Sequence, residues 1–219
     1  MRGLLSVLRL IVAAATFSFA ASGAIAQSPV PGKDYTPVTP PQPTDSGNKV
    51  EVIEFFSYAC PHCSTLEGPL NAWLRKRSAD VDFKRVPVVF HETWAPLARL
   101  YYTLEAMNLV DRLHGEVFKT IHEQRVRLQD AKAIEDWAAG KGVDRQKFKD
   151  AYNSFAVQSR TKLSNDMSRR YNVEFTPALI VNGRFLTGPS MTSPGNTVDY
   201  DRFFRVVDQL IASSRKGGK

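Results

Sequence analysis

The chain contains two cysteines, and they stand close together in the segment Cys60-Pro61-His62-Cys63. Residues 50–56, just upstream, are rich in β-branched and aromatic residues, as a strand is, and apolar residues at helical spacing follow the pair. At such a strand-to-helix junction the first cysteine lies at the helix N-terminus, where unpaired backbone N–H groups and the helix dipole favour a thiolate over a thiol. The sequence therefore predicts a reactive cysteine pair at the end of a strand.

Three other uses of a closely spaced cysteine pair can be weighed from the sequence. A tetrahedral zinc site needs further ligands, but the chain has no other cysteine, and His91, His114 and His122 are scattered, so we expect no metal. Haem attachment requires a histidine directly after the second cysteine, where this chain has Ser64. A structural disulfide across so short a loop adds little stability, because the entropic gain grows with loop length. We therefore favour a redox-active pair, and we expect the three histidines to be surface or capping residues.

The segment 1–26 has the pattern of a secretory signal peptide. A basic start precedes an apolar stretch at 10–21, and the small residues Ala24-Ile25-Ala26 follow, so we expect cleavage after Ala26 and export. The apolar stretch is too short to span a bilayer comfortably. In an oxidising compartment, a single reactive cysteine pair takes part in redox reactions rather than forming a structural disulfide that stabilises the fold.

The two ends of the expected mature chain differ in composition from its middle. Prolines are dense at 27–46, which favours an extended arm, and residues 35–38 of this arm are expected to pair briefly at a sheet edge. The tail at 215–219 is basic and is expected to be solvated. Although the formal net charge is +7, no basic stripe with interleaved aromatic residues occurs, so we expect no nucleic-acid partner.

Four strands are expected in the body of the chain. Both faces of 50–56 are mainly apolar, so this strand should be central and buried. A second strand is expected at 81–88. Two more are expected at 178–181 and 184–187, because the Asn-Gly pair between them is a strong signal for a two-residue hairpin.

Helical patterns fill most of the remaining sequence. Apolar residues recur at helical spacing over about seventy residues between the second and third strands, which predicts a helical subdomain. Asp130 and Asp144 are expected to cap helices there, and Asp199 to cap a last helix. Aromatic residues of the subdomain are expected on core-facing stripes; they are Trp94, Tyr101, Trp137, Phe148, Tyr152 and Phe155.

The order of these elements resembles the thioredoxin fold, an α/β fold, with a helical block where the DsbA family carries its insertion. The segment from Val52 to Cys63 looks like that family's active-site segment almost throughout, and the Pro61-His62 dipeptide is its specific part. The resemblance extends from about Gly32 to the final helix. It divides the chain into a discontinuous thioredoxin-like domain at 47–89 and 165–214, an inserted helical subdomain at 90–164, the arm at 27–46 and the tail at 215–219.

The resemblance implies a periplasmic thiol:disulfide oxidase that donates its disulfide to newly exported proteins. Cys60 would be the attacking and disulfide-donating sulfur, and Cys63 the buried partner that resolves the mixed disulfide. His62, next to Pro61 in the motif, would stabilise the Cys60 thiolate. A stabilised thiolate favours the reduced form over the disulfide, which makes a strong oxidant.

Two further sites are implied by the same resemblance. Thr176-Pro177 would be the family's cis-proline pair, which offers backbone groups to an extended substrate. Many family members have Val where this chain has Thr176, a difference expected to alter redox poise. Glu54 looks like the family's buried acid and would accept a proton from Cys63. The alternative is that Glu54 only pairs with a lysine, for which Lys84 is the candidate.

The expected partners also follow from the resemblance. They are reduced exported proteins and a quinone-linked membrane oxidase of the DsbB type for reoxidation, with the protein acting as a monomer and without a separate cofactor. A thiol reductase or disulfide isomerase of the same fold is the nearest alternative. Isomerases of this compartment usually carry a dimerisation domain, and residues 28–45 are too short to form one. A non-catalytic substrate-binding or chaperone module is the third interpretation.

Overall fold

The computed structural model describes residues 28–193, 195 and 197–216. The predicted signal segment and its cleavage site at Ala26 lie outside the described residues, as do residues 217–219 of the tail. Within the described part of the chain, no helix is both long enough and apolar enough to cross a membrane.

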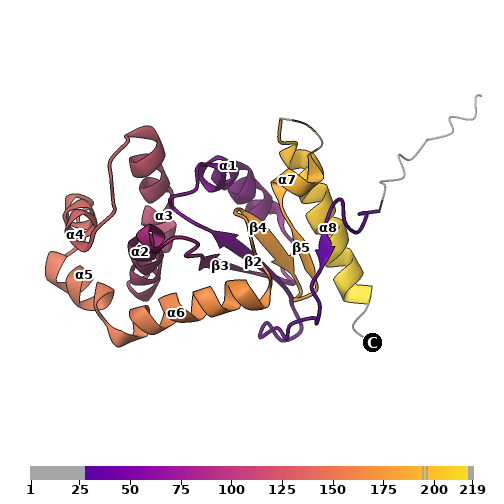
Figure 1. Cartoon of the computed structure of the whole chain (residues 1–219), viewed down its shortest axis with the longest axis horizontal. Helices are drawn as coiled ribbons and strands as arrows, with labels where there is room; N and C mark the ends of the chain where they lie inside the picture. Colours follow the sequence, from indigo (N-terminus) through magenta and orange to yellow (C-terminus); the bar gives the residue numbers. More distant parts are fainter. Residues whose placement is uncertain (1–27, 194, 196, 217–219) are drawn as a thin grey trace, which may run out of the picture.

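A five-stranded sheet of order β1-β5-β4-β2-β3 forms the centre of the molecule (Figure 1). β2 and β3 are parallel, whereas β4 is antiparallel to β2 and to β5. The short β1 pairs with the edge strand β5, which confirms the pairing predicted for the proline-rich arm. The strands are β1 (Thr36–Pro37), β2 (Val50–Phe56), β3 (Val81–Pro87), β4 (Ala178–Val181) and β5 (Phe185–Thr187).

Helices cover both faces of this sheet, so every residue of β2 is buried, as its two apolar faces predict (Figure 1). Val52 packs with Leu66 of α1 and with residues of α8, whereas Ile53 and Phe55 belong to the core that contains Tyr171 at the end of α6. The helices around the sheet are α1 (Pro61–Lys76), α6 (Phe155–Arg170), the short α7 (Pro189–Thr192) and α8 (Tyr200–Lys216).

A helical subdomain follows β3 and lies at one end of the sheet (Figure 1). Its core continues into the end of β2, because Phe56 and Tyr58 pack with Tyr101 of α2 and Phe118 of α3. The end of the sheet next to the cysteine pair is therefore built by both parts of the chain. The elements of the subdomain are η1 (Glu92–Trp94), α2 (Ala95–Ala106), α3 (Val110–Phe118), the π-helical turn η2 (Lys119–Glu123), α4 (Ala131–Gly140) and α5 (Arg145–Tyr152).

The helix caps follow the sequence closely. Asp130 and Asp144 accept hydrogen bonds from backbone N–H groups in the first turns of α4 and α5, and Asp199 does the same for α8. These three predictions are confirmed. Each carboxylate satisfies one of the N–H groups that a helix start leaves without a partner.

The expectation that Phe155 faces the core is wrong, since its side chain is 86% exposed. Ser154 accepts a hydrogen bond from the N–H of Val157 and begins a new helix, so Phe155 is the first residue of α6 rather than the continuation of α5. α6 then runs without interruption from the subdomain to the sheet. The domain boundary predicted at 164 falls inside this helix.

The β4–β5 hairpin turns at the predicted Asn-Gly pair. Asn182 and Gly183 both have left-handed backbones, with φ of 50° and 65°, which match the twist of the two strands. The arm crosses this turn, where the N–H of Gln42 donates to the carbonyl of Gly183 over 2.9 Å. A Cβ at Gly183 would lie 2.1 Å from the carbonyl oxygen of Gln42, so this position requires glycine for space as well as for φ.

We expect Gly183→Ala to lower the free energy of unfolding by about 2–4 kcal/mol, the sum of a left-handed backbone and a displaced arm. Gly47→Ala is the matched control, because Gly47 has a φ of 59° but no atom within 4 Å of the added Cβ. It should cost about 1 kcal/mol from the backbone alone. Urea denaturation measures both, and equal losses would show that the arm does not pack on the hairpin.

Candidate active site

Cys60 sits at the N-cap of α1, directly after the turn that leaves β2. Its backbone is extended, with φ of −87° and ψ of 117°, and Pro61 occupies the first helical position. The N–H of Cys60 donates to the carbonyl of Ser57 over 3.0 Å, which fixes the turn. The predicted strand-to-helix junction is therefore present, and the backbone N–H groups of His62 and Cys63 at the start of α1 interact with the Cys60 sulfur.

The two thiols have opposite environments. A hydrogen bond from the Cys63 thiol lowers the pKa of Cys60 to about 5, against the effect of burial, and the Thr176 side chain and the backbone N–H groups of Cys63 and His62 act in the same direction. Burial strongly raises the pKa of Cys63, whose side chain is fully inaccessible. At neutral pH the reduced pair therefore holds one thiolate, on Cys60, and one thiol, on Cys63.

The imidazole of His62 and the ring of Pro61 are exposed at the start of α1. The His62 side chain forms no hydrogen bond or ion pair with any residue that the structure describes. Its backbone N–H, in contrast, is one of the groups that lower the pKa of Cys60. Position 62 thus contributes through the helix backbone, and the contribution of the imidazole stays a prediction.

Thr176-Pro177 lies opposite the cysteines and precedes β4. Its peptide bond is cis, as the resemblance implied. Sγ of Cys60 lies 3.4 Å from the carbonyl oxygen of Thr176, which accepts the thiol hydrogen while Cys60 is protonated. The turn that would bind an extended substrate is thus in direct contact with the reactive sulfur.

Glu54 is fully buried in β2, and its partner is Arg85 of β3 rather than Lys84. The Nε of Arg85 donates to Glu54 over 3.0 Å. Glu54 lies opposite Arg85 in the parallel register, whereas Lys84 lies opposite Ile53 and points to the other face of the sheet. Burial raises the pKa of Glu54 to about 7, although the Arg85 charge acts to lower it.

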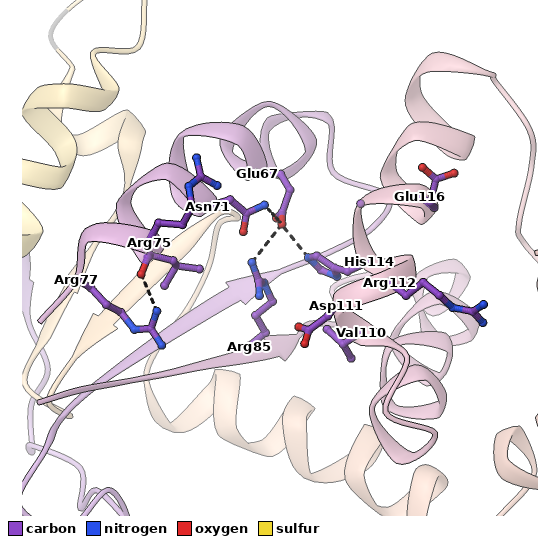
Figure 2. A pocket seen from close by; sticks show the side chains of 12 residues that line it. Glu67, Asn71, Arg75, Arg77, Arg85, Val110, Asp111, Arg112, His114 and Glu116 are labelled. Carbon is purple, nitrogen blue, oxygen red and sulfur yellow. Dashed lines mark hydrogen bonds and ion pairs between the residues drawn. The ribbon is translucent and has the colours of Figure 1, made fainter. Parts of the chain in front are cut away.

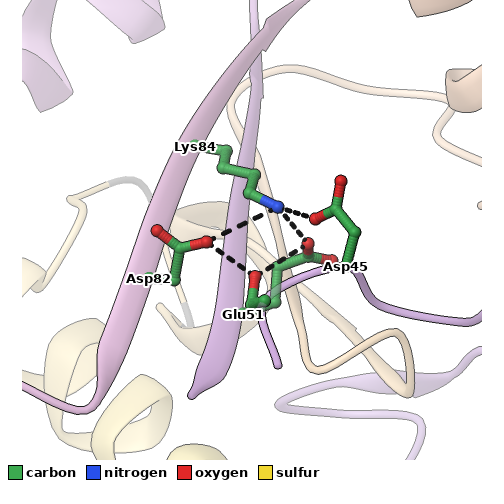
Figure 3. A network of polar contacts seen from close by, with 5 residues as sticks. Asp45, Glu51, Asp82 and Lys84 are labelled. Carbon is green, nitrogen blue, oxygen red and sulfur yellow. Dashed lines mark hydrogen bonds and ion pairs between the residues drawn. The ribbon is translucent and has the colours of Figure 1, made fainter. Parts of the chain in front are cut away.

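Lys84 instead belongs to a separate acidic cluster at the edge of the sheet (Figure 3). Its Nζ lies 2.7 Å from Glu51 and 3.5 Å from Asp82, and it also pairs with Asp45 of the arm. The alternative that Lys84 neutralises Glu54 is therefore wrong. A side chain one position along a strand emerges on the opposite face, and the strand register could not be read from the sequence.

A buried polar chain links Glu54 to the loop before Cys60. Arg85 bridges Glu54 to Glu67 of α1. Its NH2 group lies 3.2 Å from Glu67 (Figure 2). Glu67 lies 3.3 Å from Nε2 of His114, whose Nδ1 is 2.7 Å from the hydroxyl of Tyr58. Because a carboxylate only accepts, the tautomer with hydrogen on Nε2 suits both contacts, and Nδ1 then accepts from Tyr58.

The prediction that the histidines are surface or capping residues is wrong for His114. His114 is 4% exposed, and burial lowers its pKa. Nε2 of His122 lies 2.8 Å from the carbonyl oxygen of Tyr58, so η2 also contacts the active-site loop. Helical spacing was the available signal, since His114 shares its face of α3 with Val117 and Phe118. His91 is exposed, as predicted.

In the ranges that the structure describes, no group of three or more His, Cys, Asp or Glu side chains is arranged to hold a metal ion. The site that these ranges do contain is an acidic thiol beside a buried one, and the buried acid Glu54 lies in the strand that leads to them. This arrangement suits thiol–disulfide exchange, in which a thiolate attacks or leaves a disulfide.

Comparison with known proteins agrees with this chemistry. Residues 45–205 match the family model described as Thioredoxin. The thiol:disulfide interchange protein DsbA of Bordetella parapertussis is 43% identical over 184 residues, which cover 84% of this chain and 86% of that protein. This chain belongs to the DsbA family. The DsbA protein of Burkholderia cepacia is 39% identical over 214 residues and 96% of each chain.

Solved structures of DsbA proteins share the fold throughout. The crystal structure of DsbA from Pseudomonas aeruginosa matches with a TM-score of 0.79 and 32% identity, over 84% of this chain and 94% of that one. DsbA from Xylella fastidiosa matches with the same TM-score and 30% identity, over 87% and 100%. This DsbA-family chain is therefore a thiol:disulfide oxidoreductase with a thioredoxin fold, and it acts as a disulfide donor.

The acidity of Cys60 is directly measurable. We expect the rate at which iodoacetamide alkylates reduced protein to rise with pH around a midpoint near 5, because the reagent attacks the thiolate. Cys63→Ala should move this midpoint up more than His62→Ala, since the Cys63 thiol makes the largest contribution. A midpoint between pH 8 and 9 in the parent protein, about that of an unperturbed thiol, would contradict the site described above.

Proposed function

We propose that Cys60 is the sulfur that exchanges with substrate and that Cys63 stays buried throughout the cycle. A substrate thiolate attacks Sγ of Cys60, the Cys60–Cys63 bond breaks, and Cys63 leaves with the electron pair and takes up a proton. A second substrate thiolate then attacks the substrate sulfur of the mixed disulfide, and Cys60 leaves as a thiolate. The substrate gains a disulfide, and the enzyme is released as the reduced pair.

The observation that carries this proposal is the low pKa of Cys60. A sulfur that is stable as a thiolate is a good leaving group in the second step, and it stabilises the reduced product. A reductase needs the opposite balance, in which the disulfide is the more stable state. The same geometry with an ordinary thiol would therefore favour reduction of substrates, and the acidic thiol favours oxidation.

Glu54 is proposed to exchange the proton of Cys63. The Cys63 thiol has to lose its proton when it attacks a mixed disulfide during reoxidation, and it regains one when it leaves. A carboxyl group with a pKa of about 7 is half ionised at working pH, so it can accept and return that proton. Arg85 keeps the ionised form of Glu54 accessible despite its burial.

The substrate and the partners complete the proposal. An extended substrate segment binds along Thr176-Pro177 through backbone hydrogen bonds, and the exposed side chain of His62 stabilises the Cys60 thiolate. The signal segment is removed near Ala26, and the mature protein acts as a monomer without a separate cofactor. A quinone-linked membrane oxidase of the DsbB type returns the released enzyme to its disulfide form.

A trapping experiment tests the assignment of the two cysteines. When Cys63→Ala is produced with its signal segment in a bacterial periplasm, mixed disulfides on Cys60 cannot be resolved from within. We expect them to accumulate with exported proteins as bands that disappear on reduction, whereas Cys60→Ala should give none. Equal bands from both variants would reject Cys60 as the exchanging sulfur. If purified oxidised protein binds a reduced unfolded protein without oxidising it, the chaperone interpretation is correct.

The role of Glu54 predicts a pH dependence. In the parent protein, the rate at which Cys63 resolves a glutathione mixed disulfide should rise as pH passes about 7, because Glu54 is deprotonated above that value. Glu54→Gln should be about tenfold to hundredfold slower and should lose this inflection. Glu51→Gln, the other buried acid of β2, is the matched control and should keep the parental profile. An unchanged profile in Glu54→Gln would remove Glu54 from the mechanism.

A further inference from the structure

A pocket of about 270 Å³ lies immediately beside the reactive cysteine and is not used by the mechanism above. Ala59, the residue before Cys60, forms part of its wall. The other walls come from the start of the helical subdomain, at Trp94 and Leu97, and from the loop between η2 and α4. The pocket therefore lies where the sheet domain and the subdomain meet, next to the sulfur that carries the substrate.

The rim of this pocket is unusually apolar for an exposed surface. Five large hydrophobic residues of the described chain are exposed, and two of them are here: Val126, 45% exposed, lines the pocket, and Phe90, 41% exposed, packs on Trp94 with ring centroids 5.8 Å apart. A cluster of exposed apolar side chains beside an active site indicates a surface that binds another chain.

The same pocket carries positive charge. Arg125 and Arg127 line it, both are exposed, and neither forms an ion pair with any residue that the structure describes. The acids on either side of them in sequence do not neutralise them, since Glu123 forms no ion pair in the described chain and Asp130 accepts from the N–H of Ala133 as the cap of α4. The pocket thus combines apolar walls with two free guanidinium groups, which suit a carboxylate.

The loop that holds these arginines starts from a turn that is anchored on both sides. The π-helical turn η2 ends α3, and Arg125 then takes a left-handed backbone with φ of 60°. Nε2 of His122 binds the carbonyl of Tyr58, and Nε1 of Trp137 donates to the hydroxyl of Thr120 over 2.9 Å. The turn from which the loop starts is therefore joined to the active-site turn and to α4, which keeps the loop beside the site.

We propose that this pocket binds the substrate segment that flanks the reacting cysteine, taking one apolar side chain between Trp94, Leu97 and Val126 and one acidic side chain at Arg125 and Arg127. The inference rests on the proposed function and specifies its substrate class. Reduced proteins that have an apolar residue and an acidic residue near the cysteine are then oxidised faster than proteins in which a neutral or basic residue replaces the acidic one.

Oxidation of short dithiol peptides tests this preference. Each peptide carries two cysteines, one tryptophan, and Glu, Gln or Lys within four residues of the first cysteine on either side. Its two thiols become one disulfide while the Cys60–Cys63 disulfide becomes two thiols, and mass spectrometry after acid quenching gives the second-order rate constant. We expect the Glu peptide to react about threefold to tenfold faster than the Gln peptide at low salt, and the Lys peptide to be slowest.

Charge reversal locates the preference. Arg125→Glu combined with Arg127→Glu should invert the order so that the Lys peptide is fastest, with each rate divided by the rate that the same protein shows with dithiothreitol, which does not occupy the pocket. Arg205→Glu on the exposed face of α8 is the matched control and should keep the parental order. The inference is overturned if the double variant retains the Glu preference, or if the three peptides react equally with the parent protein. If no peptide is oxidised by the parent protein, the proposed function itself fails.

Discussion

Stabilisation of the Cys60 thiolate at the start of α1 is the interaction on which the rest of the site depends. The Cys63 thiol, the Thr176 side chain and two backbone N–H groups favour this anion, and together they outweigh its burial. These interactions are lost or weakened when the two sulfurs are joined, because a disulfide carries no charge and Cys63 then has no thiol hydrogen to donate. The fold therefore stabilises the reduced state, and the Cys60–Cys63 disulfide exchanges readily with substrate thiols.

The helical subdomain stabilises this arrangement as well as forming one wall of the site. Phe56 and Tyr58, which lead from β2 into the cysteine turn, pack into the subdomain core. His114 and His122 then bind the hydroxyl and the carbonyl of Tyr58. A buried histidine without a partner would be costly, so these contacts hold the turn and the insertion together as one unit. The geometry at Cys60 thus depends on residues more than fifty positions away in sequence.

Much of the fold and the centre of the site could be predicted because they are encoded locally. The cysteine pair follows a strand whose two apolar faces demand burial, and aspartates mark the starts of α4, α5 and α8. The Asn-Gly pair fixes the β4–β5 turn through its left-handed backbone. Each of these signals acts over a few residues, so tertiary contacts confirm it rather than create it.

The predictions that were wrong concern side-chain partners and burial, which only the tertiary structure decides. Glu54 meets Arg85 and not Lys84 because of the register between β2 and β3, which no short segment specifies. His114 is buried because α3 packs on the cysteine turn, and Phe155 is exposed because Ser154 starts another helix. The pocket beside Ala59 could not be predicted either, since its walls come from three separate segments.

The folded protein prefers the reduced pair over the disulfide. Equilibration of Cys60 and Cys63 against graded glutathione buffers, read by alkylation and mass, measures that preference. At pH 7 the pair should stay reduced until the buffer is strongly oxidising. Because the folded pKa of Cys60 lies below its unfolded value, the stabilisation is fully present above the unfolded pKa and is lost as pH falls through about 5, so the preference should weaken there. A pair that becomes oxidised in a predominantly reduced buffer at pH 7 would show that the fold stabilises the disulfide instead.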